Sequence, residues 1–122
     1  MTMYLYVALG GAIGACLRFF ITTKADLWFG KGLPFGTLAV NVIGSFLLGL
    51  LYMVLQEPYA ESPYRALLGI GVLGAFTTFS TFSLDTVLMI QHGEWFKALA
   101  NVGLNVIVCV MAAGLAVFLV KG

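Results

Sequence analysis

Four long apolar runs constrain this chain more than any other feature of its sequence. They cover residues of about 4–21, 34–55, 65–90 and 96–120. A helix needs about 20 mainly apolar residues to cross the hydrocarbon core of a bilayer, and each run approaches or exceeds that length. The sequence therefore predicts an all-α integral membrane protein whose residues 1–122 form a single four-span domain.

The composition agrees with a membrane location and excludes several classes of function. Only 9% of the residues are charged and 61% are hydrophobic, whereas soluble domains carry about 25% charged residues. The net charge is +1, so we expect no nucleic-acid partner, which would need a clustered basic face. No hydrolase, metalloprotease or P-loop motif is present, and we expect no catalytic residue and no enzyme. Cys16 and Cys109 lie inside apolar runs, and we expect both to be buried packing residues.

The third apolar run contains an unusual cluster of glycines and hydroxyl residues, GIGVLGAFTTFSTFS, from Gly69 to Ser83. Each glycine weakens a helix by about 1 kcal/mol relative to alanine. Burying a hydroxyl in hydrocarbon without a partner costs roughly 2–7 kcal/mol. We therefore predict that the third span is broken or locally unwound in its middle, as membrane helices tolerate only around a cavity or site. The hydroxyl residues concerned are Thr77, Thr78, Ser80, Thr81 and Ser83.

Three phenylalanines, Phe76, Phe79 and Phe82, repeat at every third position of this cluster. At 100° per residue they would form one ridge, with the hydroxyls spread over the remaining arc. Such a ridge either packs into neighbouring helices or presents its positive ring edges to an anion. Rings and hydroxyls bind an ion weakly enough to release it, which conduction requires.

The first span combines small residues with a cation. Gly10 and Gly14 have the GxxxG spacing that favours close contact between membrane helices. Arg18 follows in the last turn, where it either reaches toward the interface or places a positive charge at the mouth of an anion path.

Asparagines are the main polar residues of the second and fourth spans. Asn41 either bridges to another helix or lines a path with the two donors of its amide. Asn101 and Asn105 are one turn apart and share a helix face.

The basic residues give a weak orientation signal. Four spans put both termini on one side, together with a polar turn at residues 57–65. That side carries two basic residues and the other carries four: Arg18, Lys24, Lys31 and Lys97. Since orientation follows a clear excess of lysine and arginine, we expect insertion both ways and pairing as an antiparallel, dual-topology homodimer.

Three motifs together resemble a known family. They are GGAIGACLR at residues 10–18, GTLAVN at 36–41 and GVLGAFTTFSTFS at 71–83. In length, span number and motif order the chain is similar to the small fluoride channels known as Fluc or CrcB proteins. The resemblance implies a multi-pass antiparallel homodimer in the lipid of the bacterial inner (plasma) membrane. It also implies two pores that export fluoride passively and lower cytoplasmic fluoride.

The resemblance also implies roles for particular residues. Phe79, Phe82 and Asn41 would line the pore, and Arg18 matches the arginine of the family's first span. Thr81, Ser83 and Ser80 would form a hydroxyl track. The backbone carbonyls of Gly74 and Thr77, from both subunits, would hold a structural Na⁺. That fits the general use of unwound carbonyls as sodium ligands.

The chain departs from the family pattern at several positions. Ala75 and Phe76 stand where many members have a glycine and a small aliphatic residue, Asp85 replaces a glutamate, and Asn101 takes a polar position of the fourth span. Coordination by backbone carbonyls needs no side chain and therefore tolerates the change at Ala75.

Two other functions compete with a channel. A proton-coupled small multidrug transporter needs a carboxylate embedded in the membrane. The first span has none, and Asp85 should lie near an interface. A non-transporting assembly subunit would explain the packing glycines but not the hydroxyls beside phenylalanines.

Overall fold

The computed structural model describes residues 2–30, 32–55 and 62–121, and these residues form helices joined by short connections. The first two helices are α1 (Thr2–Phe29) and α2 (Phe35–Val54). The following segment, 65–91, consists of η2 (Arg65–Leu73), α3 (Gly74–Phe76) and α4 (Phe79–Gln91). The last, 95–121, consists of α5 (Trp95–Gly103), η3 (Leu104–Val108) and α6 (Cys109–Lys121). Each of the four helical segments is long and apolar enough to cross a membrane, which confirms the predicted all-helical, four-span chain.

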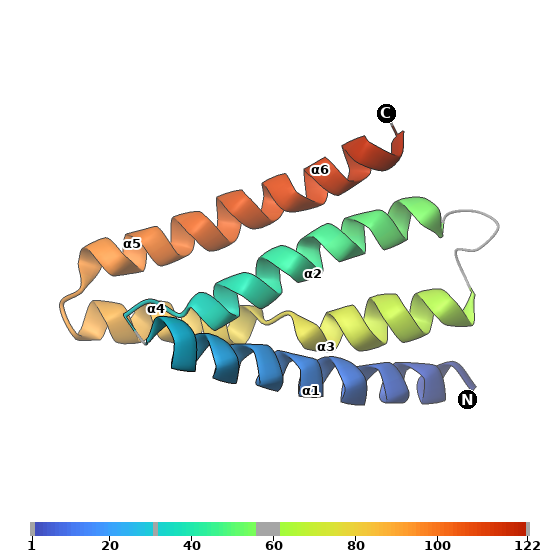
Figure 1. Cartoon of the computed structure of the whole chain (residues 1–122), viewed down its shortest axis with the longest axis horizontal. Helices are drawn as coiled ribbons and strands as arrows, with labels where there is room; N and C mark the ends of the chain where they lie inside the picture. The colour runs from blue at the N-terminus through green and yellow to red at the C-terminus, as the bar shows by residue number, and fades with distance from the viewer. Residues whose placement is uncertain (1, 31, 56–61, 122) are drawn as a thin grey trace.

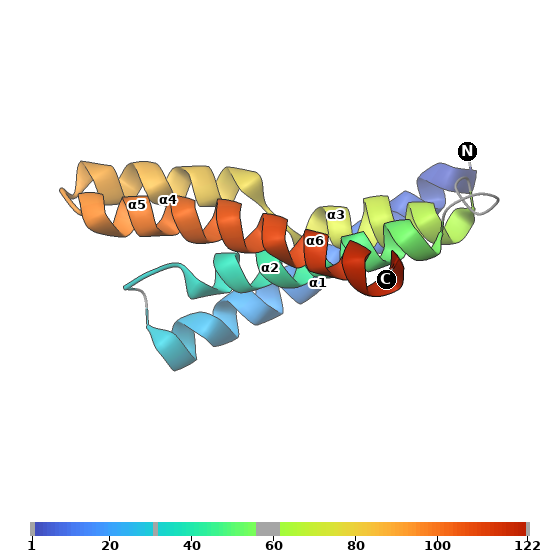
Figure 2. The ribbon, with the colours of Figure 1, turned by 90° about the horizontal axis from the view of Figure 1, so that it is seen from above.

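The helical segments run along the long axis of the molecule, and both termini lie at the same end (Figure 1). α1 packs along η2 and α3, α2 packs along α6, and α4 packs along α5. Toward the end away from the termini, the α4–α5 pair separates from α1 and α2 (Figure 2). Thr77 and Thr78 are not helical and interrupt the third helical segment between α3 and α4. This interruption lies where the separation begins.

The first helix is longer than the predicted first span. It continues beyond Ile21 to Phe29 because residues 22–29 contain no glycine or proline. Gly30 ends it with a φ of 76°, which suits a residue without a Cβ. The predicted polar turn at residues 57–65 falls partly on residues 56–61, which lie outside the described chain.

Close packing of α1 against η2 depends on glycine, as the GxxxG spacing predicts. Gly10 and Gly14 are both buried. A Cβ at Gly10 would clash with the backbone oxygen of Leu67, and a Cβ at Gly14 with that of Val72. The predicted contact is confirmed, and it brings α1 alongside the start of the interruption.

The interior consists mostly of small side chains together with Leu73, Phe76 and Phe82, and most of the other large apolar side chains are exposed. Val40 and Ala116 are fully buried, whereas Phe96 is among the most exposed side chains. Cys109 is half-buried and Cys16 is exposed, so the prediction of a buried Cys16 was wrong. Cys16 lies two residues beyond Gly14, about 200° around the helix from it, and so turns away from the packed face.

Gly14→Ala should destabilise the protein, because the added methyl overlaps the Val72 carbonyl and overpacking of this kind costs about 1–3 kcal/mol. Gly11→Ala is the matched control: a Cβ there meets nothing within 4 Å. It should leave stability unchanged or raise it through helix propensity. Thermal unfolding of both variants in detergent checks this, and equal unfolding temperatures would contradict the packing described.

Candidate functional site

The candidate site surrounds two residues with extended backbone between α3 and α4. Thr77 has φ −89° and ψ 161°, and Thr78 has φ −152° and ψ 116°. The Thr78 hydroxyl then accepts a hydrogen bond of 3.2 Å from the N–H of Thr81 and caps the start of α4. The chain thus leaves one helix and begins another within two residues.

The interruption frees backbone carbonyls that a continuous helix would satisfy. The Thr78 N–H, which would bond to the Gly74 oxygen, donates instead to Asn41 Oδ1 at 2.8 Å. The Thr81 N–H, which would bond to the Thr77 oxygen, donates to the Thr78 hydroxyl. The carbonyls of Gly74 and Thr77 therefore lose their helical donors.

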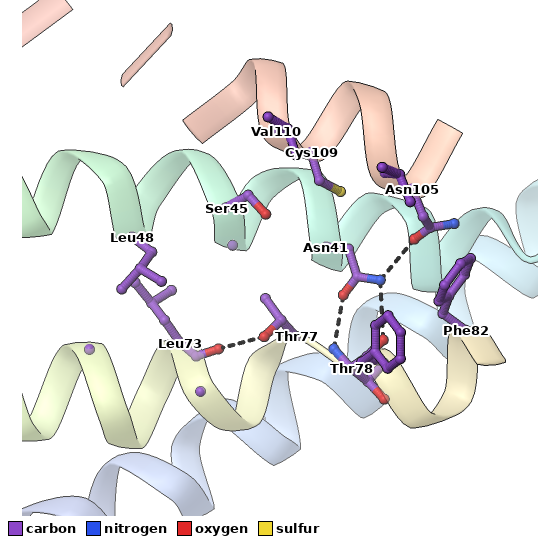
Figure 3. A pocket seen from close by; sticks show the side chains of 15 residues that line it. Asn41, Ser45, Leu48, Leu73, Thr77, Thr78, Phe82, Asn105, Cys109 and Val110 are labelled. Carbon is purple, nitrogen blue, oxygen red and sulfur yellow. Dashed lines mark hydrogen bonds between the residues drawn. The ribbon is translucent and has the colours of Figure 1, made fainter. Parts of the chain in front are cut away.

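Asn41 of α2 clamps the extended backbone from one side. Its Oδ1 accepts from the Thr78 N–H, and its Nδ2 donates to the Thr78 oxygen at 3.2 Å (Figure 3). The same Nδ2 donates to Asn105 Oδ1 at 2.9 Å. Asn41 therefore bridges to the third and fourth helical segments, which confirms the first interpretation of this residue. It also lines a cavity, and its role in an anion path stays a prediction.

Arg18 of α1 meets the interruption from the other side. Its Nε donates to the Ala75 oxygen at 3.0 Å, in place of the N–H that a continuous helix would supply. The cationic head group thus lies against the interruption. It also lines a cavity of about 360 Å³ between α1, α2 and α4, together with Asp26, Thr81 and Asp85.

A second cavity, of about 370 Å³, lies between the interruption, α2 and the fourth helical segment. Phe79 and Phe82 both line it, with ring centroids 5.4 Å apart and planes inclined at 59°. Phe82 is only 7% exposed, whereas Phe79 is 76% exposed. The carbonyl-bearing residues Gly74 and Thr77 line the same cavity. Thr78 lines both cavities and therefore lies between them.

The predicted ridge of three phenylalanines was wrong for Phe76. Phe76 ends α3 and is buried, and it is not part of the lining of the cavity that holds Phe79 and Phe82. Positions 76, 79 and 82 share one ridge only in a continuous helix, and the extended residues Thr77 and Thr78 change the side-chain directions before α4 begins.

The hydroxyls of the cluster mostly satisfy nearby backbone. Thr77 donates to the Leu73 oxygen at 3.1 Å and Ser83 to the Phe79 oxygen at 2.9 Å. Ser80 lies 3.5 Å from the Thr78 hydroxyl. Thr81 lines the cavity with Arg18, whereas Ser80 and Ser83 are absent from the linings of both cavities.

Three polar residues that line the phenylalanine cavity were not assigned to the site from the sequence: Ser45, Asn105 and Cys109. Ser45 lies one turn after Asn41, and Cys109 lies one turn after Asn105. Residues four positions apart share a helix face, so the positions four residues after Asn41 and Asn105 would have identified Ser45 and Cys109.

Comparisons with known proteins give a consistent result. A family model described as CrcB-like protein, Camphor Resistance (CrcB), matches residues 5–117. A protein named fluoride-specific ion channel FluC from Alteromonas mediterranea is 56% identical over 123 residues, covering 100% of this chain and 97% of the relative. Proteins of the same name from Pseudoalteromonas translucida and Shewanella denitrificans are 55% and 52% identical. They cover 93% and 90% of this chain and 96% and 89% of their own lengths. The chain belongs to the CrcB-like family.

Proposed function

We propose that this chain forms a fluoride-selective channel in the bacterial inner membrane, through which fluoride leaves the cell passively and cytoplasmic fluoride falls. It acts as a channel and not as an enzyme. The observation that carries the proposal is the cavity where two phenylalanine rings and an asparagine meet an interrupted helix. The names of the relatives agree with this function.

The chemistry around the interruption suits an anion that must enter and leave quickly. On one side of Thr78, Arg18 and Thr81 supply a positive charge and a hydroxyl in a cavity that also holds the carboxylates of Asp26 and Asp85. On the other side, Phe79 and Phe82 supply ring edges. Ring edges carry a partial positive charge and attract an anion weakly. Conduction needs binding that is strong enough to admit the ion and weak enough to release it. The interruption in the third span would lie at the middle of the membrane. Ser80 and Ser83 would lie beside it and form a hydroxyl track together with Thr81.

An antiparallel, dual-topology homodimer would complete these pores. Phe79 is largely exposed in one copy although it lines the cavity, so a second copy can supply the missing wall. The small interior of a single copy and the weak orientation signal of its basic residues support the same assembly.

The freed carbonyls of Gly74 and Thr77 fit a structural Na⁺ at the centre of that dimer. Their helical N–H donors are engaged by Asn41 and Thr78, and the two residues line one cavity wall. Unwound carbonyls in interrupted membrane helices are general sodium ligands. Bound Na⁺ would hold the two interruptions together.

Phe79→Ile should reduce fluoride efflux from liposomes by at least about tenfold, because isoleucine has no ring edge to offer an anion. The fold of each copy should change little in stability, since Phe79 is 76% exposed within one copy. Phe82→Ile should also reduce efflux and should cost stability as well, because this ring is buried.

Phe96→Ile is the control for the phenylalanine variants, because Phe96 is the more exposed ring and lies outside both cavity linings. It should conduct like the unmodified protein. Normal efflux in both Phe79→Ile and Phe82→Ile would remove these rings from the pore.

Replacing Na⁺ by a large organic cation during purification should lower the unfolding temperature of the dimer. A ligand that binds only the folded state stabilises by about 2.7 kcal/mol at 100 times its dissociation constant, so the unfolding temperature should rise with Na⁺ concentration. Chloride is kept constant as the control. An unfolding temperature independent of Na⁺ would contradict the assignment of Gly74 and Thr77.

A further inference from the structure

A continuous chain of hydrogen bonds connects the fourth helical segment to the interruption. Asn41 Nδ2 donates to Asn105 Oδ1 at 2.9 Å, and Asn105 Nδ2 donates to Asn101 Oδ1 at 3.1 Å. Asn101 Nδ2 donates to the Thr86 hydroxyl at 3.0 Å, and that hydroxyl donates to the Phe82 oxygen at 2.8 Å. The side chains of Asn41, Asn105, Asn101 and Thr86 form what we call the amide ladder.

Backbone groups fix the direction of the amide ladder. The Thr78 N–H can only donate, so Asn41 must turn Oδ1 toward it and Nδ2 toward Asn105. Asn105 then presents Oδ1 to Asn41, and its Nδ2 faces the side-chain and backbone oxygens of Asn101. Reversing one amide would place two donors or two acceptors against each other.

The two middle members of the ladder are buried, whereas Asn41 and Thr86 are half-buried. Asn101 is 3% exposed and Asn105 is 6% exposed. Within the described ranges, every buried side-chain nitrogen and oxygen has a hydrogen-bond partner. A network that is fully satisfied in this way is rigid, and losing one member leaves a buried partner unpaired. The π-helical turn η3 carries Asn105, and such turns widen a helix locally.

We propose that Asn105, Asn101 and Thr86 are positioning residues that hold the Asn41 amide, and through it the Thr78 backbone, in one orientation. Asn101 and Thr86 line neither cavity, so they reach the site only through other residues. Both ends of the ladder lie on the segment that carries the pore rings, at the Thr78 backbone and the Phe82 oxygen. The consequence for ion flow rests on the proposed channel function, whereas the consequence for the Thr78 backbone does not.

Thr86→Val tests the proposal because it removes the hydroxyl and nearly keeps the shape. Fluoride efflux should fall about fivefold, the effect of losing one net hydrogen bond. Thr86→Ser restores the hydroxyl and should restore the efflux. Thr23→Val, at an exposed position of α1, controls for the loss of a hydroxyl elsewhere.

The same substitution in an Asn41→Ala background separates positioning from folding. If the ladder acts through Asn41, Thr86→Val should add little further loss there, as expected for residues of one network. An equal fold-loss in both backgrounds would overturn the proposal. Unchanged efflux in Thr86→Val, beside reduced efflux in Asn41→Ala, would overturn the ladder and leave the channel function intact.

Hydrogen–deuterium exchange at the Thr78 N–H gives a second readout that needs no ion flow. Thr86→Val should speed this exchange relative to Thr86→Ser, because a loosened Asn41 protects the N–H less. Faster exchange in a protein without fluoride flux would support the ladder while rejecting the channel function. Identical exchange in Thr86→Val and Thr86→Ser would overturn the ladder.

Discussion

The structure around the site depends on the pair of hydrogen bonds between the Asn41 amide and the Thr78 backbone. Two extended residues inside an apolar helical segment expose N–H and C=O groups, and each unpaired group in hydrocarbon costs several kcal/mol. Asn41 satisfies both groups of Thr78 with one side chain. The Thr78 hydroxyl then caps α4, so the helix resumes at Phe79 and the interruption is limited to Thr77 and Thr78.

Other contacts hold the interruption in place from the opposite side. Gly10 and Gly14 let α1 approach η2 at backbone distance, and that approach brings Arg18 within 3.0 Å of the Ala75 oxygen. Two helices therefore hold neighbouring residues of the third segment. α2 bonds to Thr78 through the Asn41 amide, and α1 bonds to Ala75 through the Arg18 guanidinium. Thr78 separates the cavity with the cation from the cavity with the rings, which is the arrangement that the proposed anion path uses.

The sequence predicted features that follow from local periodicity and failed where a change of backbone direction intervened. Run length identified four helical segments, and the GxxxG spacing identified the packed face of α1. The prediction that Phe76 shares a ridge with the other two phenylalanines was wrong, because the 100° periodicity of a helix does not continue across the extended residues Thr77 and Thr78. Asn101 and Asn105 were correctly placed on one face, yet their partners come from other helices and no spacing within the chain reveals them.

The most direct test of the proposed function is fluoride efflux from liposomes that carry the purified protein, with chloride efflux measured in parallel. Rapid loss of fluoride with retention of chloride is the expected result for the proposed channel, whose site offers weak anion contacts in a partly apolar cavity. Well-folded protein that releases neither ion, or that releases both at equal rates, would contradict a fluoride-selective channel.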